Sequence, residues 1–240
     1  MKKALGLIVA ALLIAGFAGH AAASFSDGDL IRVVYDKVNF VEVATDLGSI
    51  SGLLNGTVTV STDSFLGTVN GISPSPNWSN LFVAYFSFNG ANYNVWGAAG
   101  SKLTGASGSK WGAADGGWNT YRNITLIPAG TNTVTTTNIN GSTTDSYYRL
   151  LSGNSGIGNL GGWFATGSSV DASLASLASS NSISEKLYLT TPSTHAGSFT
   201  DLTITTYKTG TSSAVVPVPA AILLLAPGLA GLIGLRRRLS

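Results

Sequence analysis

The chain has 240 residues, of which 10% are charged and none is cysteine. The absence of cysteine excludes disulfide bonds, thiol catalysis, zinc–thiolate sites and the acylated cysteine of a lipoprotein. Five of the thirteen basic residues, Lys2, Lys3 and Arg236–Arg238, lie at the two ends, and the remaining eight face eleven acidic residues. The sequence between the ends has no basic patch of the kind that binds nucleic acid, so no nucleic-acid partner is expected.

Residues 1–23 have the three-part pattern of a secretory signal peptide. Two lysines form a positive start, an apolar run follows from Ala4 to Gly19, and Ala21 and Ala23 place small residues where signal peptidase requires them. An uncleaved membrane anchor is the weaker alternative, because a spanning helix needs about 20 apolar residues. The pattern predicts export by the Sec route and cleavage by signal peptidase, with Ser24 as the first mature residue.

Residues 24–208 are predicted to form one all-β domain, because short β-branched and aromatic segments alternate with Gly, Asn and Asp turns. Leu81–Phe88 is expected to be central in a sheet, with a hairpin turn at Asn89-Gly90 after it. The other predicted strands are Leu30–Tyr35, Phe40–Thr45, Thr57–Ser61, Tyr93–Trp96, Asn123–Ile127, Thr133–Thr137, Tyr147–Leu151, Glu185–Thr190 and Leu202–Lys208. So many short strands predict a β-sandwich or jelly roll with at most one or two short helices.

One segment of this domain has helical spacing instead. Val170, Leu174, Leu177 and Ala178 are spaced like one face of a short helix. Ser169 or Asp171 is the residue expected to cap this helix.

Residues 110–122 are a Gly-rich polar stretch, expected to be a loop, that contains Trp111, Trp118 and Tyr121. Sugar rings stack on aromatic faces, so an exposed platform of these three side chains would bind polysaccharide, as in a carbohydrate-binding module. Trp is highly buried on average, which favours the alternative that these side chains anchor the loop in the core. Their exposure to solvent distinguishes the two interpretations.

Catalytic and metal-binding signals are weak, and no catalytic residue, metal or cofactor is predicted. His195 is the one histidine left after signal cleavage, and no Gly-x-Ser-x-Gly motif accompanies it. Glu42 and Glu185 are the only glutamates, and glycoside hydrolysis by paired carboxylates is the lesser alternative. Asp27-Gly28-Asp29 and Asp115 lack the spacing of a calcium loop and are interpreted as turn residues.

The C-terminal residues differ in composition from the domain. The polar stretch 209–215 is expected to be a linker. Two prolines spaced by one residue then hold the chain extended, which is the conformation that a protease or transpeptidase cleft can bind. The 19 residues from Pro217 to Leu235 would span about 28 Å as a helix, close to the hydrocarbon thickness of about 30 Å. The arginines that follow face the cytoplasm by the positive-inside rule.

This tail resembles the PEP-CTERM sorting signal in its Val-Pro-x-Pro-Ala variant. In the commoner form a Glu lies between the prolines, where this chain has Val218. The motif residues are Val216, Pro217, Val218, Pro219 and Ala220, and the closing cluster is Arg236, Arg237 and Arg238. The resemblance implies transient insertion in the inner membrane and processing by an exosortase, a membrane transpeptidase, in a Gram-negative bacterium that makes exopolysaccharide.

The sequence as a whole indicates a non-enzymatic protein of the cell surface or extracellular matrix, with exopolysaccharide, as in a biofilm, as a candidate partner. The carbohydrate-binding module and the secreted glycoside hydrolase described above are the alternatives.

Overall fold

The fold is given by a computed structural model that describes residues 23–55, 64–105, 108–124, 126–127, 131–139, 146–152, 160, 163–164, 169–191 and 197–215. The strands are β1 (Ala23–Ser24), β2 (Asp29–Asp36), β3 (Val41–Ser49), β4 (Leu81–Asn89), β5 (Asn94–Ala99), β6 (Leu126–Ile127), β7 (Thr133–Thr137), β8 (Asp171–Ser173), β9 (Ser182–Thr190), β10 (Ser198–Tyr207) and β11 (Ser212–Val215). The helices are α2 (Ile50–Leu54), α3 (Gly108–Ile124) and α4 (Tyr147–Leu150), with 3-10 turns η1 (Thr68–Asn70), η2 (Trp78–Asn80) and η4 (Ala175–Ala178). The prediction of a mainly β fold is confirmed.

Nine strands form one antiparallel sheet in the order β11-β10-β9-β5-β4-β2-β3-β7, and β8 pairs with β4 beyond the end of β5. β1 and β6 form a separate pair. The predicted strand Leu81–Phe88 is β4, which lies between β5 and β2, so its central position is confirmed. The hairpin predicted at Asn89-Gly90 is confirmed as well, because Asn89 pairs with Asn94 across the β4–β5 turn.

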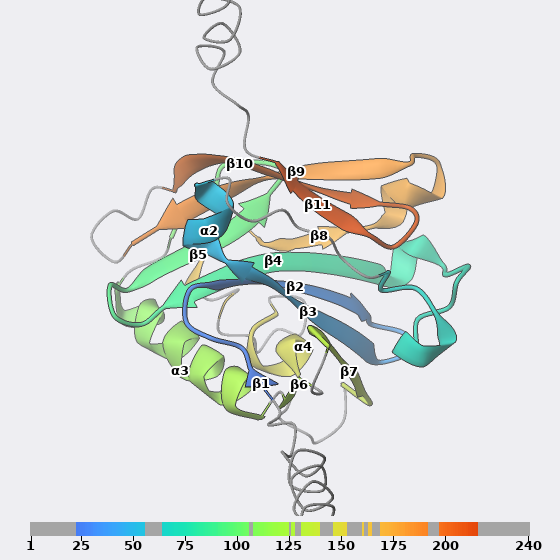
Figure 1. The fold of residues 1–240 in the computed structure, drawn as a ribbon, viewed down its shortest axis with the longest axis horizontal. Coiled ribbons are helices and arrows are strands. Elements are labelled where there is room, and N and C mark those ends of the chain that lie inside the picture. Colours follow the sequence, from blue (N-terminus) through green and yellow to red (C-terminus); the bar gives the residue numbers. More distant parts are fainter. Residues whose placement is uncertain are drawn as a thin grey trace, which may run out of the picture.

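The sheet curls into a half-barrel (Figure 1), so that strands far apart in the sheet order touch through their side chains. Arg32 of β2 donates a hydrogen bond of 3.1 Å to the hydroxyl of Ser212 on β11, although four strands lie between them. The Tyr85 hydroxyl lies 2.6 Å from both Ser212 Oγ and Thr206 Oγ1. The described strands therefore form one curled sheet and one small pair, rather than two large separate sheets.

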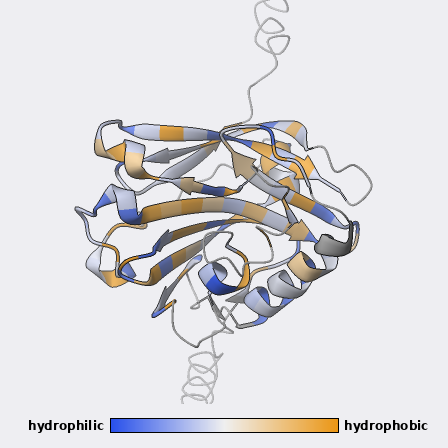
Figure 2. Ribbon diagram, turned by 180° about the vertical axis from the view of Figure 1, so that it is seen from behind, coloured by the Kyte–Doolittle hydropathy of each residue, from blue (hydrophilic) through white to orange (hydrophobic). Residues whose placement is uncertain are grey.

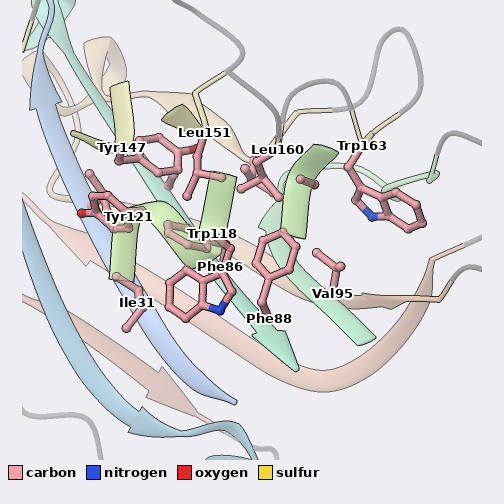
Figure 3. Close-up of a cluster of buried hydrophobic side chains, with 14 of the residues drawn as sticks. Ile31, Phe86, Phe88, Val95, Trp118, Tyr121, Tyr147, Leu151, Leu160 and Trp163 are labelled. Atoms are coloured by element: carbon pink, nitrogen blue, oxygen red, sulfur yellow. The ribbon is translucent and has the colours of Figure 1, made fainter. Parts of the chain in front are cut away.

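Both faces of this sheet are buried. The central strands are hydrophobic along much of their length (Figure 2), and alternate residues enter two different cores. The concave core includes Leu30, Val34, Val43, Leu81, Val83, Tyr85, Trp96, Leu187 and Ile204. The outer core lies on the opposite face under α3 and α4 (Figure 3) and includes Ile31, Val33, Phe86, Phe88, Trp118, Tyr121, Tyr147 and Trp163.

Helix α3 replaces the loop that the sequence predicted over 110–122, so that prediction is wrong. Its buried residues, Ala114, Gly117, Trp118 and Tyr121, are three or four positions apart, which is the spacing of one helix face. The helix contains four glycines, each of which costs up to about 1 kcal/mol relative to alanine. Packing of Trp118 and Tyr121 against the sheet outweighs that cost.

The strand predicted at Tyr147–Leu151 is also wrong, because this segment begins the short helix α4. Glu42 of β3 accepts hydrogen bonds of 3.0 Å from the backbone N–H groups of Tyr147 and Tyr148. Ser146 Oγ accepts another from Arg149 N at 3.3 Å. These acceptors satisfy the first N–H groups of the helix, which have no partner within it.

Other predicted elements are formed in part. The helix predicted over Val170–Ala178 is divided into β8 and η4, and Leu174 and Leu177 are buried. Of the strand predicted at Asn123–Ile127, only β6 is a strand, since α3 extends to Ile124. Part of the stretch expected to be a linker, Ser212–Val215, forms β11 and pairs with β10. The strand predicted at Thr57–Ser61 lies entirely outside the described residues.

Gly112→Ala and Gly116→Ala are each expected to raise the free energy of unfolding by about 0.5–1 kcal/mol. Both glycines are exposed on α3, and a Cβ at either would meet no atom within 4 Å. Alanine should therefore gain helix propensity without a clash, which urea unfolding can measure. Gly97→Ala is the control and should destabilise the protein, because its Cβ would overlap Val170 and Leu103. Destabilisation by both α3 variants would contradict this account of the helix.

Candidate functional site

The residues predicted for signal cleavage lie at the start of the described chain. Ala23 and Ser24 form β1, which pairs with Ile127 and Leu126 of β6, while Ala21 lies outside the described residues. The next residue, Phe25, is 1% exposed and stacks on Tyr121 with ring centroids 5.8 Å apart. Cleavage after Ala23 would leave a single residue, Ser24, ahead of this buried anchor.

The predicted sorting residues Val216–Ala220 and Arg236–Arg238 lie outside the described residues. The last described residue, Val215, ends the edge strand β11 and is 57% exposed. β11 and β1 lie on opposite sides of the domain (Figure 1). Within the described part of the chain, no helix has the length and apolar content needed to cross a membrane.

The three aromatic residues of the predicted sugar platform do not share one exposed surface. Trp118 and Tyr121 are completely buried in the outer core. Trp118 donates from Nε1 to Asp27 Oδ1 at 2.8 Å, and the Tyr121 hydroxyl donates to Glu42 at 3.0 Å. Only Trp111 is partly exposed, and it contacts Tyr93 edge to face at 4.6 Å between ring centroids. The arrangement agrees with core anchoring.

The two glutamates lie on opposite faces of the sheet. Glu42 is paired with Tyr35 across β2 and β3 and is bonded to α4 on the outer side. Glu185 is paired with Ile204, a residue of the concave core, and its carboxylate accepts no hydrogen bond from the described residues. Burial raises the pKa of Glu185 to about 8, with a smaller contribution from Asp171. They therefore do not face each other across a cleft as a glycosidase pair would.

The aspartates that the sequence suggested as turn residues make structural contacts. Asp29 accepts from the backbone N of Ser26 at 3.1 Å, within a turn. Asp27 forms an ion pair with Arg122 at 2.7 Å. Burial, and then the nearby Asp27 carboxylate, raise the pKa of Asp115. Among the described residues, no three or more His, Cys, Asp or Glu side chains are grouped to hold a metal, and His195 is not among those residues.

A cavity that no sequence motif indicated lies between α2 and the β4–β5 hairpin. The cavity has a volume of about 320 Å³ and is open to solvent. It is lined by the turn Asp27-Gly28, the start of α2 from Ser49 to Ser51 with Leu54, the hairpin residues Asn89, Asn92 and Asn94, and Trp96. We call it the hairpin pocket.

The asparagines of the hairpin pocket are held by their own turn. Asn89 Oδ1 accepts from the backbone N of Ala91 at 3.1 Å and of Asn92 at 3.4 Å, and Asn92 Oδ1 accepts from Asn94 N at 3.2 Å. A backbone N–H can only donate, so its partner in each of these bonds must be the amide oxygen and not the amide nitrogen. The oxygens of Asn89 and Asn92 are therefore held toward the turn. Each Nδ2 group is left as a donor, since none of the hydrogen bonds between described residues uses Nδ2 of Asn89 or Asn92.

The hairpin pocket also has an apolar side and a strained rim. Ile50 and Trp96 are 3% and 8% exposed, and Trp96 Nε1 is buried without a hydrogen-bond partner among the described residues. Tyr93 at the hairpin tip has φ 58°, an unusual conformation for an aromatic residue, and is 53% exposed. Its neighbours Asn92 and Asn94 line the pocket. The only sequence signal was the cluster of asparagines around Asn89-Gly90, which was interpreted as a turn alone.

Comparison of the chain with models of known protein families, with curated proteins and with solved structures gave no match.

Proposed function

We propose that this chain is an exported, non-enzymatic protein of the cell surface or extracellular matrix, sorted through its C-terminal tail. The observation that carries the proposal is the order of features after the domain: a Pro-x-Pro motif at Val216–Ala220, an apolar run and three arginines. The described domain supports it, because β11 ends at the exposed Val215, directly before the motif. The described domain therefore ends at an exposed residue, one position before the motif in the sequence.

In this proposal the chain passes through the Sec route, loses residues 1–23 to signal peptidase and is held transiently in the inner membrane by its tail. An exosortase-like transpeptidase then processes the motif and releases the domain to the surface, where exopolysaccharide is a candidate partner. The domain delivered is sandwich-like, in that the two halves of the curled sheet face each other across the concave core.

A non-enzymatic role is supported by the positions of the acidic residues. Glu42 supports α4, and Glu185 is enclosed in the concave core. Sugar binding by a platform of Trp111, Trp118 and Tyr121 is not carried forward, because two of its three members are buried.

Replacing Pro217 and Pro219 with alanine is expected to stop processing while membrane insertion persists. Alanine allows the motif to continue the helix that follows, which removes the extended segment that a protease cleft binds. The apolar content of the tail is unchanged, so the chain should accumulate as a membrane-bound precursor. Immunoblots of membrane and surface fractions, with mass spectrometry of the C-terminus, measure the effect.

The matched control is Pro74→Ala with Pro76→Ala, which removes a second Pro-x-Pro pair from a surface segment of the domain. This control should mature like the parent. Changing Arg236–Arg238 to serine should instead misplace the chain, since the cytoplasmic charge that orients the helix is lost. Normal maturation of the Pro217/Pro219 variant would refute sorting through this motif and favour a plain anchor.

A further inference from the structure

We infer that the hairpin pocket is a binding site for a neutral saccharide. This inference goes beyond the sorting proposal and does not depend on it, because it concerns only the described domain. It rests on the chemistry of the side chains around the pocket: fixed amide donors, a single charge that is already paired, and an apolar side.

The size of the hairpin pocket suits a small ligand. Its volume of about 320 Å³ lies at the lower end of the range of about 300–1,000 Å³ typical of ligand pockets. The cavity is open to solvent and Asn92 of its lining is exposed, so part of a short oligosaccharide would occupy the cavity while the rest extends into solvent.

The polar groups of the pocket complement hydroxyl groups, which donate and accept at once. The Nδ2 groups of Asn89 and Asn92 are donors held in place by the bonds to their own Oδ1 atoms. Asp27 uses Oδ1 for Trp118 and Arg122 and leaves Oδ2 as an acceptor. Fixed groups of this kind lose little conformational entropy when a ligand binds, which favours affinity.

The charges around the pocket favour a neutral ligand over an ion. Among the described residues of the lining, Asp27 is the only charged side chain, and Arg122 lies 2.7 Å from it. A phosphate or carboxylate ligand would find no lysine, arginine or histidine among these described lining residues to pair with. A divalent cation would find one carboxylate where calcium sites use several oxygen ligands.

The apolar side of the pocket matches the C–H face of a sugar ring. Ile50, Leu54 and Trp96 add hydrocarbon and indole surface to the lining that also contains the amides. Trp96 Nε1 is itself buried from solvent, so Trp96 contributes apolar contact to the pocket and no hydrogen bond. A lining that combines amides with an apolar and aromatic surface distinguishes a saccharide from a purely polar ligand.

The test is isothermal titration of the full chain, in an amine-oxide detergent that has no sugar headgroup, with neutral tetrasaccharides of glucose, galactose, mannose and N-acetylglucosamine. At least one should bind with a dissociation constant below about 1 mM. The double variant Asn89→Ala with Asn92→Ala should weaken that binding at least about tenfold, since it removes the two fixed hydrogen-bond donors. Ser51→Trp, which fills the mouth of the pocket from an exposed position, should abolish it.

The matched control is Asn123→Ala, the same change at an exposed residue of α3 outside the pocket; it should bind like the parent. The inference is overturned if no tetrasaccharide binds, if both pocket variants bind as the parent does, or if binding requires added calcium. Near-ultraviolet circular dichroism establishes that each variant is folded. A failure of sorting would change where the protein is found in cells and leave these titrations unaffected, so the two proposals fail separately.

Discussion

Glu185→Gln should stabilise the protein at pH 9 and leave its stability nearly unchanged at pH 4. Glu185 is 5% exposed, and neither of its carboxylate oxygens has a hydrogen-bond partner among the described residues. Burial, with a smaller contribution from Asp171, raises its pKa from 4.5 to about 8. Glutamine has nearly the same shape but carries no charge at any of these pH values, so it avoids the desolvation cost.

The sign of the effect follows from which state holds the proton. An unfolded chain loses the Glu185 proton near pH 4.5, whereas the folded protein keeps it until about pH 8. Between these values the folded state binds more protons, so the free energy of unfolding falls as the pH rises, and it stays low above pH 8. Each unit of pKa difference corresponds to about 1.4 kcal/mol, so the full cost is on the order of several kcal/mol.

Urea unfolding of parent and variant at pH 4, 6, 8 and 9 measures this difference. Glu42→Gln is the matched control, because Glu42 is the other glutamate and its oxygens accept bonds from Tyr121, Tyr147 and Tyr148. It should destabilise the protein at neutral pH, since an amide nitrogen would replace an accepting oxygen. If Glu185→Gln retains the pH dependence of the parent, the fall in stability does not arise from Glu185.

Trp118→Ala should lower the free energy of unfolding by about 3–5 kcal/mol, the range for loss of a fully buried large aromatic side chain. Trp118 stacks on Phe88 at 5.8 Å and meets Phe86 edge to face at 6.0 Å (Figure 3). Its Nε1 also binds Asp27 at 2.8 Å. The change therefore leaves a cavity between α3 and the sheet and removes a hydrogen bond that links α3 to the segment before β2.

Trp111→Ala is the comparison, because Trp111 is on the same helix but only partly buried. It should cost about 1 kcal/mol, as expected where an edge contact with Tyr93 is lost. Thermal unfolding of both variants separates the two roles. If both variants lost an equally small amount of unfolding free energy, Trp118 would not anchor α3. The interpretation of these aromatic residues as a surface platform would then be favoured again.

The strands that were predicted correctly from the sequence are those whose own residues have strong β-propensity, so that no distant contact is needed to explain them. Leu81–Phe88 is apolar or aromatic at every position except Ser87 and became β4, and Thr133–Thr137 became β7 with the same bounds. Helix α3 was missed because its glycines indicated a loop, although Ala114, Trp118 and Tyr121 repeat at helical spacing. For α4 the deciding residue was Glu42, 105 positions away from Tyr147, and no local pattern contains it.

Like α4, the curl of the sheet and the hairpin pocket depend on contacts between residues that are far apart in the sequence. Arg32 and Ser212, which join the two halves of the half-barrel, are 180 positions apart. The pocket combines the turn at Asp27, the start of α2 and the β4–β5 hairpin, three segments that no sequence motif connects. Binary patterning predicts which residues are buried, but it does not specify which strand meets which across a curved sheet.

The position of β11 has a mechanical consequence for a domain held by its C-terminus. A pull on Val215 would act on an edge strand whose one partner among the described strands is β10, and the hairpin would open one pair at a time from Thr203–Val215 toward Thr206–Ser212. The last of these pairs is not held by the backbone alone, because the Ser212 side chain bonds to Arg32 and Tyr85 across the concave core. The force would then pass from the edge strand to β2 and β4 in the middle of the sheet. This polar cluster would therefore resist further separation of β11 from β10.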